Sequence, residues 1–300
     1  MKAIFASQKI DGGGNQSPRE LANHFYYDII DLNQSWENVK AKKQVWYMND
    51  NIYHLLKDDR EAFRKVLSYA DDIRIVLNFV MGDAWKDSIL VDFPVKQIVF
   101  LNQIKKSEWV KKTHNKRHSL IPVDVIKPPI GLDRFKKDRE YKGYRIGRHS
   151  RISLKYPKDP CWIYDQLNNN RFQFSFMLAH PKIKKEFNFK YYEWNEIPVQ
   201  DFLNQTDIYL AIINPNTHEQ AGRSNMEAMA AGCCVVVENR DGPKDYIKHG
   251  ETGFLVNSEQ EALDIINKLT VSDIERIGMN AKNYAFNNFK ISNWDKVFKT

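Results

Sequence analysis

The sequence predicts an α/β protein of two domains, each with a parallel sheet covered by helices on both faces. Short apolar runs alternate with stretches of helical periodicity along nearly the whole chain, which is the rhythm of βαβ units. The chain has 300 residues, enough for two domains of ordinary size. The stretch 128–144, "PPIGLDRFKKDREYKGY", interrupts the rhythm with proline, glycine and a run of charges, and we interpret it as a connector.

The first series of apolar runs indicates a domain over residues 1–140. Helices are expected between its strands at 18–27, 51–69 and 103–114. The expected strands are "KAIFAS", "VWYMN", "IRIVLNFV", "QIVFLN" and "IPVDVIKPP".

The second series indicates a domain over residues 141–283, followed by a C-terminal helix, 284–300, that is expected to pack back on the first domain. The expected strands are "RIGRHS", "FQFSFMLA", "FNFKYYEW", "DIYLAII", "CCVVVE" and "GFLV". The expected helices lie near 160–168, 198–205, 224–232, 259–269, 272–287 and 292–299.

Composition indicates a globular chain, with 42% hydrophobic and 28% charged residues. No apolar run reaches the roughly 20 residues of a membrane span. Three cysteines and an N-terminal "MKAIFAS" too short for a signal peptide lead us to expect a cytoplasmic protein. The net charge is +7, and residues 1–140 carry 24 Lys and Arg against 19 Asp and Glu. A positive excess suits partners that bear phosphate, although solvated surface lysines would account for it equally well.

One stretch, "HEQAGRSNMEAMAAGCCVVVENRDGPKDYIKHGETGFLV" (218–256), contains two glutamates around a loop that opens a helix. Ser224 and Glu227 have the spacing of a capping box, which is a structural explanation for Glu227. The start of this helix offers amide groups and a positive dipole end that suit phosphate, and Gly222 permits close approach of a ligand. Glu219 has no comparable structural explanation, and its carboxylate could bind sugar hydroxyls.

This stretch closely resembles the retaining, nucleotide-sugar-dependent glycosyltransferases of group 1, which have two Rossmann-like domains facing across a cleft (the GT-B fold). The resemblance rests on Glu219–x7–Glu227, "EAMAAG", the following strand and "GETGFLV". It implies that Glu219 lies near the donor sugar and that Glu227 binds the ribose. It also implies that the amides around Gly222, Arg223, Ser224 and Asn225 hold the diphosphate. Ala221 departs from the family pattern, where a bulky residue is usual, so local sugar contacts are expected to differ.

A second motif of the family, a Gly-Arg pair followed by a lysine, is matched by "RIGRHSRISLKYP" (145–157). The resemblance implies that these cations stabilise the leaving diphosphate, where negative charge develops. Gly147 and Lys155 take the family positions. Arg148 and Arg151 both remain candidates for the arginine, because the spacing to Lys155 is longer than usual.

Three further segments complete the expected site. Gly13 and Gly14 follow the first strand and are expected in a loop that shapes the acceptor and phosphate region. Asn78 stands near the place where many relatives have a histidine. Within "KYYEWNEIP", Tyr192 or Trp194 could stack on the nucleobase, and we favour Trp194, although core packing is expected for at least one of them.

The stretch "IKKSEWVKKTHNKRHS" (104–119) is basic and contains an aromatic residue. A membrane-surface or nucleic-acid face is conceivable. We favour packing of Ile104, Trp109 and Val110 on the sheet, with the lysines in solvent, because the segment lies between two expected strands.

The resemblance implies transfer of a sugar from a nucleoside diphosphate sugar, with a UDP-sugar favoured, to an acceptor hydroxyl. No cofactor and no metal are expected, since no carboxylate pair of the DxD type occurs and Arg and Lys can neutralise the diphosphate. The acceptor stays open between a cell-envelope lipid or glycan, a hydroxymethylated base in DNA, and a protein or small molecule. The alternatives are a non-catalytic module that binds sugar nucleotides or nucleic acid, and a sugar-nucleotide epimerase. The oligomeric state is open.

Overall fold

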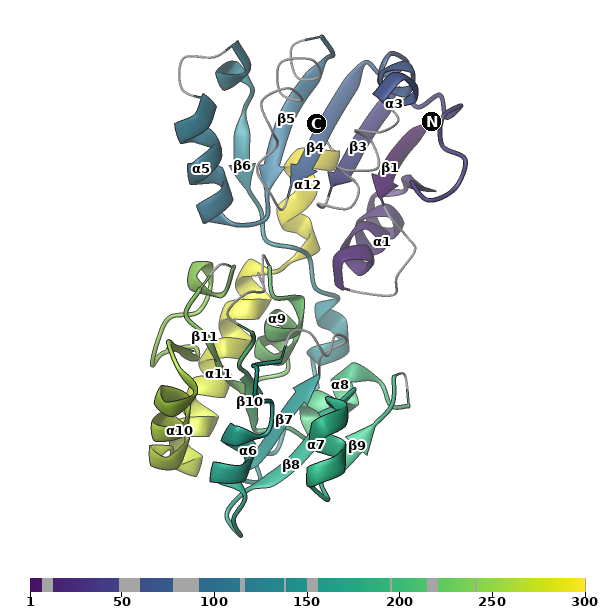
Figure 1. Cartoon of the computed structure of the whole chain (residues 1–300). Coiled ribbons are helices and arrows are strands. Elements are labelled where there is room, and N and C mark those ends of the chain that lie inside the picture. The colour runs from purple at the N-terminus through teal and green to yellow at the C-terminus, as the bar shows by residue number, and fades with distance from the viewer. Residues whose placement is uncertain are drawn as a thin grey trace. The chain divides into compact units, whose positions relative to one another are not determined.

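The computed structural model shows two compact units (Figure 1). It describes residues 1–6, 13–48, 60–77, 92–113, 117–137, 139–149, 156–194, 196–214, 221–240 and 242–299. Unit 1 comprises Met1–Pro129 and Ile291–Thr300, and unit 2 comprises Ile130–Lys290. Each unit contains a six-stranded parallel sheet flanked by helices, which confirms the predicted α/β fold class.

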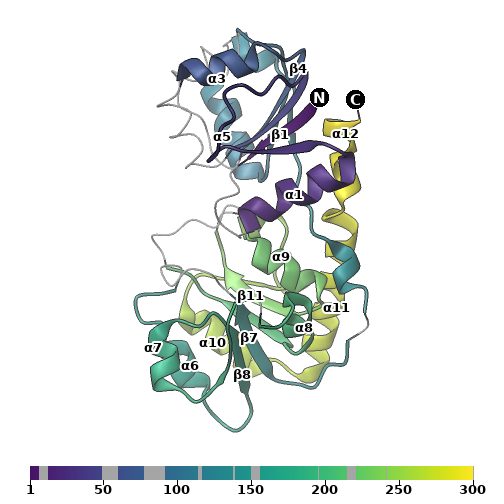
Figure 2. The same ribbon diagram turned by 90° about the vertical axis from the view of Figure 1, so that its right-hand side faces the viewer.

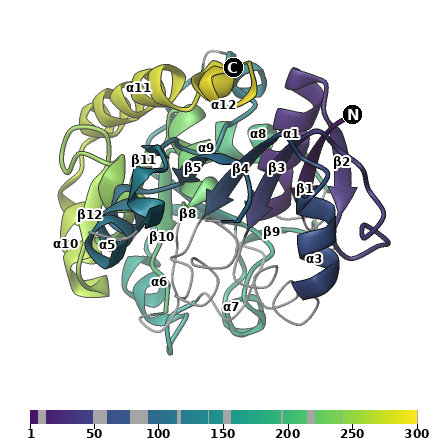
Figure 3. The ribbon, with the colours of Figure 1, turned by 90° about the horizontal axis from the view of Figure 1, so that it is seen from above.

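Unit 1 is built on a sheet with the strand order β2-β1-β3-β4-β5-β6, which can be followed in Figure 3 from β2 to β5. Its strands are β1 (Lys2–Ala6), β2 (Asp28–Asp31), β3 (Lys43–Met48), β4 (Asp72–Leu77), β5 (Val95–Phe100) and β6 (Val123–Val125). Its helices are α1 (Gly13–Phe25), α3 (Arg60–Leu67), α5 (Gln103–Thr113), the 3-10 helices η2 (Arg117–Leu120) and η6 (Ile291–Trp294), and α12 (Asp295–Phe298).

Both faces of the unit 1 sheet are covered, as the near-continuous apolar runs predict. Successive residues of a strand point to opposite faces. In β1, Ala3 and Phe5 lie in a core with Trp46, whereas Ile4 lies in a second core with Val45. Strands buried on both sides need apolar residues at every position, which is why "KAIFAS" shows no alternation of apolar and polar residues.

The C-terminal segment is part of unit 1 and lies beside α1 (Figure 2). The rings of Phe298 and Phe25 stack at 4.5 Å between centroids. Trp294 and Val297 are fully buried in the second of the two cores. Arg74 fixes the backbone by donating from Nη1 to the carbonyl of Lys296 at 2.9 Å. Residues 291–299 of the expected C-terminal segment 284–300 therefore belong to unit 1, whereas residues 284–288 are the end of α11 in unit 2.

Unit 2 has the strand order β12-β11-β10-β7-β8-β9. Its strands are β7 (Arg145–His149), β8 (Gln173–Met177), β9 (Lys190–Tyr192), β10 (Ile208–Ala211), β11 (Cys234–Glu238) and β12 (Phe254–Val256). Its helices are α6 (Trp162–Leu167), α7 (Pro181–Glu186), α8 (Val199–Asn204), α9 (Arg223–Ala230), α10 (Glu259–Lys268) and α11 (Val271–Asn288), with the 3-10 helices η3 (Leu132–Phe135) and η5 (Gly242–Asp245).

The unit 2 sheet also separates two cores. Cys234 and Val236 of β11 lie in one core, and Val235 and Val237 lie in the other. Cys233 precedes the strand on the side of Val235, so the adjacent cysteines face apart, as the sequence predicts. Both are buried free thiols.

Two features differ from the sequence-based expectations. Strand β2 was not predicted, because "DIID" is short, half polar and only partly buried at the edge of its sheet. The boundary between the units falls at 129/130, whereas we expected it at 140/141. Ile130 and Phe135 are almost fully buried in a core of unit 2, which places the first part of the expected connector there.

The strand order of unit 2 has a topological switch point between β7 and β10. Connections from β7 lead outward to β8 and β9, and connections from β10 lead outward to β11 and β12. In open α/β sheets, ligands bind outside the carboxyl ends of the strands at such a point. A ligand site is therefore expected beside the residues that follow His149 and Ala211.

Candidate functional site

Helix α9 begins at the switch point, and Gly222 is its N-cap. Gly222 has the left-handed angles φ 65° and ψ 51°, and as a glycine it provides no side-chain cap of its own. A residue with a Cβ would be strained in this conformation. The predicted capping box of Ser224 and Glu227 is therefore wrong, because the N-cap is Gly222, two residues before Ser224. The amides of Arg223, Ser224 and Asn225 occupy the first turn, where no preceding helical carbonyl can accept from them.

Glu227 lies one turn into α9, and its carboxylate contacts two arginines and a histidine. Its Oε1 accepts from Nε of Arg223 at 3.1 Å and from Nη2 of Arg134 at 3.3 Å. Its Oε2 lies 3.4 Å from Nε2 of His149. We call these four residues the Glu227 cluster. It joins α9 to the end of β7 and to η3, a short 3-10 helix in the connector.

The cluster holds the Glu227 carboxyl in its ionised form. Burial by itself raises the pKa of Glu227, because it removes the charge from water. The guanidinium of Arg223, the hydrogen bond from His149 and the charge of Arg134 outweigh burial and lower the pKa to about 2. A buried carboxylate that stays charged at neutral pH is suited to accepting hydrogen bonds from ligand hydroxyls.

His149 is fixed by packing and by its backbone. Its ring meets those of Tyr209 and Phe202 edge-on, at 5.4 and 6.1 Å between centroids. The hydroxyl of Tyr209 donates to its carbonyl at 2.9 Å. Nδ1 is buried without a hydrogen-bond partner among the described residues, so we assign the ring proton to Nε2, which faces Glu227.

Arg148 points to the opposite face of the sheet from His149, because the two are adjacent in β7. It is 2% exposed, and its guanidinium lies 3.7 Å from the centroid of the Tyr156 ring. Nη1 donates to the carbonyl of Ile212 at 2.8 Å, so Arg148 ties the end of β7 to the end of β10. Burial opposes its charge, but the neighbouring tyrosines, Tyr156 first among them, leave the pKa of Arg148 raised.

Gly147 has a packing role. A Cβ at this position would lie 2.3 Å from Oγ1 of Thr206, which is far closer than side chains approach. Strand β7 can pair with β10 at this register only if residue 147 has no side chain. The glycine of the family motif therefore has a structural explanation that requires no ligand.

The loop that follows β10 is held by the end of β11. The carboxylate of Glu238 accepts from the amide of Ile213 at 3.1 Å. Nη2 of Arg240 donates to the carbonyls of Ile213 and Asn214 at 3.2 and 2.7 Å. These bonds fix the start of the segment that leads toward Glu219.

Four of the predicted site residues, Asn78, Arg151, Lys155 and Glu219, lie outside the described residues. The choice between Arg148 and Arg151 as the diphosphate arginine therefore stays a prediction. Gly13 and Gly14 are the first residues of α1, so the expectation that they lie in a loop is wrong.

The two aromatic candidates for stacking on a base differ in their surroundings. Tyr192 is 8% exposed and packs edge-on against Phe202 in a core, whereas Trp194, two residues beyond it, is 38% exposed. Exposure leaves Trp194 as the aromatic residue that could stack on a ligand.

The sequence did not reveal two members of the Glu227 cluster. His149 stands directly after Arg148, and its position at the end of a strand beside the switch point was the available signal. Arg134 is one charge among several in the connector, and nothing in the local pattern distinguishes it. Only the fold brings Arg134 next to Glu227, which is 93 positions away.

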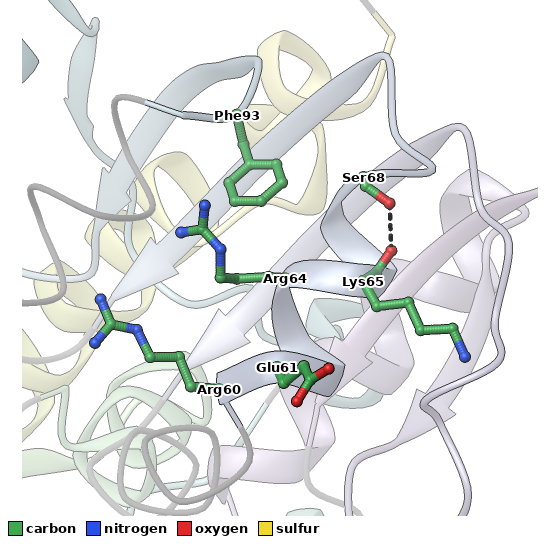
Figure 4. A pocket seen from close by; sticks show the side chains of 6 residues that line it. All are labelled: Arg60, Glu61, Arg64, Lys65, Ser68 and Phe93. Carbon is green, nitrogen blue, oxygen red and sulfur yellow. Dashed lines mark hydrogen bonds between the residues drawn. The ribbon is translucent and has the colours of Figure 1, made fainter.

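A hollow on unit 1 is unrelated to these motifs. It is lined by α3 and the neighbouring loop, and Figure 4 shows its six residues, Arg60, Glu61, Arg64, Lys65, Ser68 and Phe93. Nη2 of Arg64 donates to Oδ2 of Asp92 at 2.9 Å. The guanidinium of Arg64 lies 5.1 Å from the ring centroid of Phe93. The hollow therefore offers less free positive charge than its composition suggests.

The stretch 104–119 packs only in part as we favoured, since Ile104 is partly buried and only Trp109 of the three named residues is buried. Trp109 is 1% exposed and lies in a core of unit 1. Val110 is 48% exposed, so the prediction that it packs on the sheet is wrong.

Neither a metal cluster nor a membrane span is found within the described ranges. No group of three or more His, Cys, Asp or Glu side chains is arranged to hold a metal ion there. No helix there has the length and apolar character needed to cross a bilayer.

Comparisons with known proteins bear on the family resemblance and on the fold. Residues 163–284 match the family model "Glycosyl transferases group 1", which confirms the resemblance drawn from the two glutamates. A search of curated protein sequences found no match.

Several solved structures share the fold. HepE from Anabaena, in complex with UDP and glucose, superposes with a TM-score of 0.75 at 14% identity, over 100% of this chain and 98% of that chain. A glycosyltransferase from Rickettsia africae ESF-5 gives a TM-score of 0.64 at 13% identity, over 99% and 98%. A mutant of S. aureus TarM in complex with Fondaparinux, alpha-GlcNAc-glycerol and UDP gives 0.63 at 15% identity, over 86% and 55%. These likenesses establish the two-domain fold.

Proposed function

From the premise that this chain is a glycosyltransferase of the group 1 family, we propose that unit 2 binds a nucleoside diphosphate sugar and that the sugar is transferred to an acceptor hydroxyl. The Glu227 cluster carries the proposal. It places an ionised carboxylate, with a pKa of about 2, in the second turn of a helix that starts at a switch point. A carboxylate there can accept from ribose hydroxyls while the first turn of the helix faces a phosphate group.

The diphosphate is assigned to the start of α9. The amides of Arg223, Ser224 and Asn225 and the positive end of the helix dipole suit an anion. Gly222 has no side chain that would keep the anion away. Together with Lys155 and either Arg148 or Arg151, these groups would stabilise the charge that develops on the leaving diphosphate.

We further propose that transfer proceeds with retention and without a metal ion. In this scheme the acceptor hydroxyl attacks from the leaving-group face and a donor phosphate oxygen accepts its proton, so no side chain has to act as nucleophile. Glu219 would bind the hydroxyls of the donor sugar. Full activity in the presence of EDTA is the expected result, and a requirement for Mg²⁺ or Mn²⁺ would contradict the metal-independent scheme.

UDP is the favoured nucleotide. The structures of HepE and TarM that share this fold contain UDP. Trp194 would stack on the base, since it is the exposed member of the two aromatic residues near the end of β9. A cytoplasmic location is part of the proposal and agrees with the three free thiols.

The acceptor is proposed to be a cell-envelope glycan or lipid, or a hydroxymethylated base in DNA. The excess of basic residues over 1–140 suits either anionic partner. The two can be separated by binding assays, because association with DNA weakens steeply as salt rises. Association with vesicles that contain anionic lipid, without association with DNA, would favour the lipid.

The first test is thermal unfolding of the protein with a panel of nucleotides and nucleotide sugars. A ligand of the native state raises Tm by mass action. We expect UDP and at least one UDP-sugar to raise Tm, and Lys155→Ala to lose turnover while the fold is kept. If no nucleoside diphosphate or nucleotide sugar binds, the donor site is absent.

A non-catalytic module of the same fold is the alternative. It would show the same rise in Tm with UDP. Slow hydrolysis or transfer of the sugar from the UDP-sugar that raises Tm most would exclude it.

A further inference from the structure

Arg134 is the most exposed member of the Glu227 cluster. Its side chain is 31% exposed, whereas those of Glu227, Arg223 and His149 are 8%, 7% and 9% exposed. Arg134 therefore covers the carboxylate on its solvent side. Its Nε donates to the carbonyl of Gly131 within its own turn at 3.3 Å. The side chain thus has a second, local anchor that does not depend on Glu227.

The acceptor sites of Glu227 are nearly filled. A carboxylate offers about four lone-pair sites, two on each oxygen. Arg223 and Arg134 occupy both sites of Oε1, and His149 occupies one site of Oε2. One site remains, but the two adjacent hydroxyls of a ribose need two. A ribose can be bound through both hydroxyls only if one present partner leaves.

Arg134 is the partner that can leave at the lowest cost. Arg223 comes from the same helix as Glu227 and is buried with it, so its release would leave two charges in the interior without compensation. His149 is held by Tyr209 and Phe202. Arg134 already meets solvent, can remain hydrated after release, and keeps the bond to Gly131.

We propose that Arg134 is a displaceable cap on Glu227, which the two hydroxyls of the donor ribose replace. The inference rests on the proposed function, in which Glu227 binds the ribose. Before the donor binds, Arg134 completes the charge compensation of a buried carboxylate. When the donor binds, the hydrogen bond from Nη2 of Arg134 to Oε1 of Glu227 breaks, and a ribose hydroxyl donates to Oε1 instead.

The exchange makes Arg134 a determinant of selectivity for ribose over 2′-deoxyribose. A ribonucleotide has to displace Arg134 in order to place both hydroxyls on Glu227. A 2′-deoxynucleotide has only the 3′ hydroxyl, which can use the remaining site of Oε2 without any displacement. Removal of the cap therefore helps the ribonucleotide and leaves the deoxynucleotide unchanged.

The test is isothermal titration of UDP and of 2′-deoxy-UDP against the wild-type protein and Arg134→Met. Both compounds carry the same diphosphate, so the effect of the lost charge on phosphate cancels in the ratio of the two Kd values. We expect the preference for UDP over 2′-deoxy-UDP to increase by about three- to tenfold in Arg134→Met. This is the size of effect that follows when one partly exposed hydrogen bond between charged groups no longer has to be broken. Arg134→Gln serves as a second variant if Arg134→Met does not fold.

The control is Lys136→Met, which removes a cation from the C-cap of η3, the same short helix that carries Arg134. Lys136 is 68% exposed and pairs with Asp133, so the UDP preference should stay at the wild-type value. An unchanged preference in Arg134→Met would overturn the inference, and a reduced preference would identify Arg134 as a permanent clamp on Glu227. A wild-type protein that binds neither compound would contradict the proposed donor site itself.

Discussion

Arg223 donates from Nε to Oε1 of Glu227 at 3.1 Å, across one turn of α9, with both side chains less than a tenth exposed. Charges that are removed from water need a partner and further hydrogen bonds if they are not to destabilise the fold. His149 and Arg134 supply the additional contacts. The arrangement keeps a carboxylate charged and oriented beside the start of a helix.

Glu227→Gln tests the contribution of this charge to donor binding. The glutamine keeps the shape and one oxygen acceptor, but it cannot accept from both ribose hydroxyls as well as from Arg223 and His149. We expect the Kd for UDP to rise by about tenfold or more, in the range of a lost hydrogen bond to a charged group. Titration calorimetry measures the change. Glu251→Gln is the control, since Glu251 is 69% exposed and pairs only loosely with Lys248.

The depressed pKa of Glu227 predicts a specific dependence of stability on pH. The folded-state pKa of about 2 lies below the ordinary value of 4.5, so the stabilising contribution is fully present above pH 4.5. It is lost as the pH falls from 4.5 toward 2, because the unfolded chain then binds the proton more readily. The difference in urea midpoint between the wild type and Glu227→Gln should therefore shrink over this window. A difference that stays constant from pH 6 to pH 3 would contradict the assignment.

Gly147→Ala tests whether the glycine of the Gly-Arg motif serves packing. The new Cβ would meet Oγ1 of Thr206 at 2.3 Å, and we expect a loss of about 1–3 kcal/mol in the free energy of unfolding. Adding Thr206→Ala removes the clashing atoms and should recover part of that loss. A double-mutant cycle by urea unfolding measures the coupling. If the effects of the two substitutions were purely additive, the contact with Thr206 would not be the reason for a glycine at position 147.

The buried ion pairs of Asp207 predict that its substitution destabilises the fold without touching the donor site. It is fully buried and accepts from Arg139 at 3.2 Å and from Arg145 at 2.7 Å. Asp207→Asn leaves the two guanidinium groups without their counterion, and we expect a cost of about 3–5 kcal/mol in the free energy of unfolding. Asp71→Asn is the matched control, because Asp71 is 75% exposed beside Lys42 and should change stability by less than about 1 kcal/mol. Equal effects of the two substitutions on the urea midpoint would contradict this account.

The sequence by itself determined the fold class, the strands that are buried on both faces, and the resemblance to the group 1 glycosyltransferases. Apolar runs such as "CCVVVE" and the spacing of Glu219 and Glu227 are local patterns, and local patterns can be detected in a single chain. The same patterns located the candidate donor site at the start of α9.

The tertiary structure alone decided which side chains surround Glu227. The N-cap depended on the left-handed backbone of Gly222, so the spacing of Ser224 and Glu227 was misleading. Arg134 reaches Glu227 because η3 packs beside α9 in the fold, and Arg148 and His149 separate because β7 is an inner strand with a core on each face. Contacts between residues far apart in the chain depend on packing, and packing leaves no mark in the local pattern.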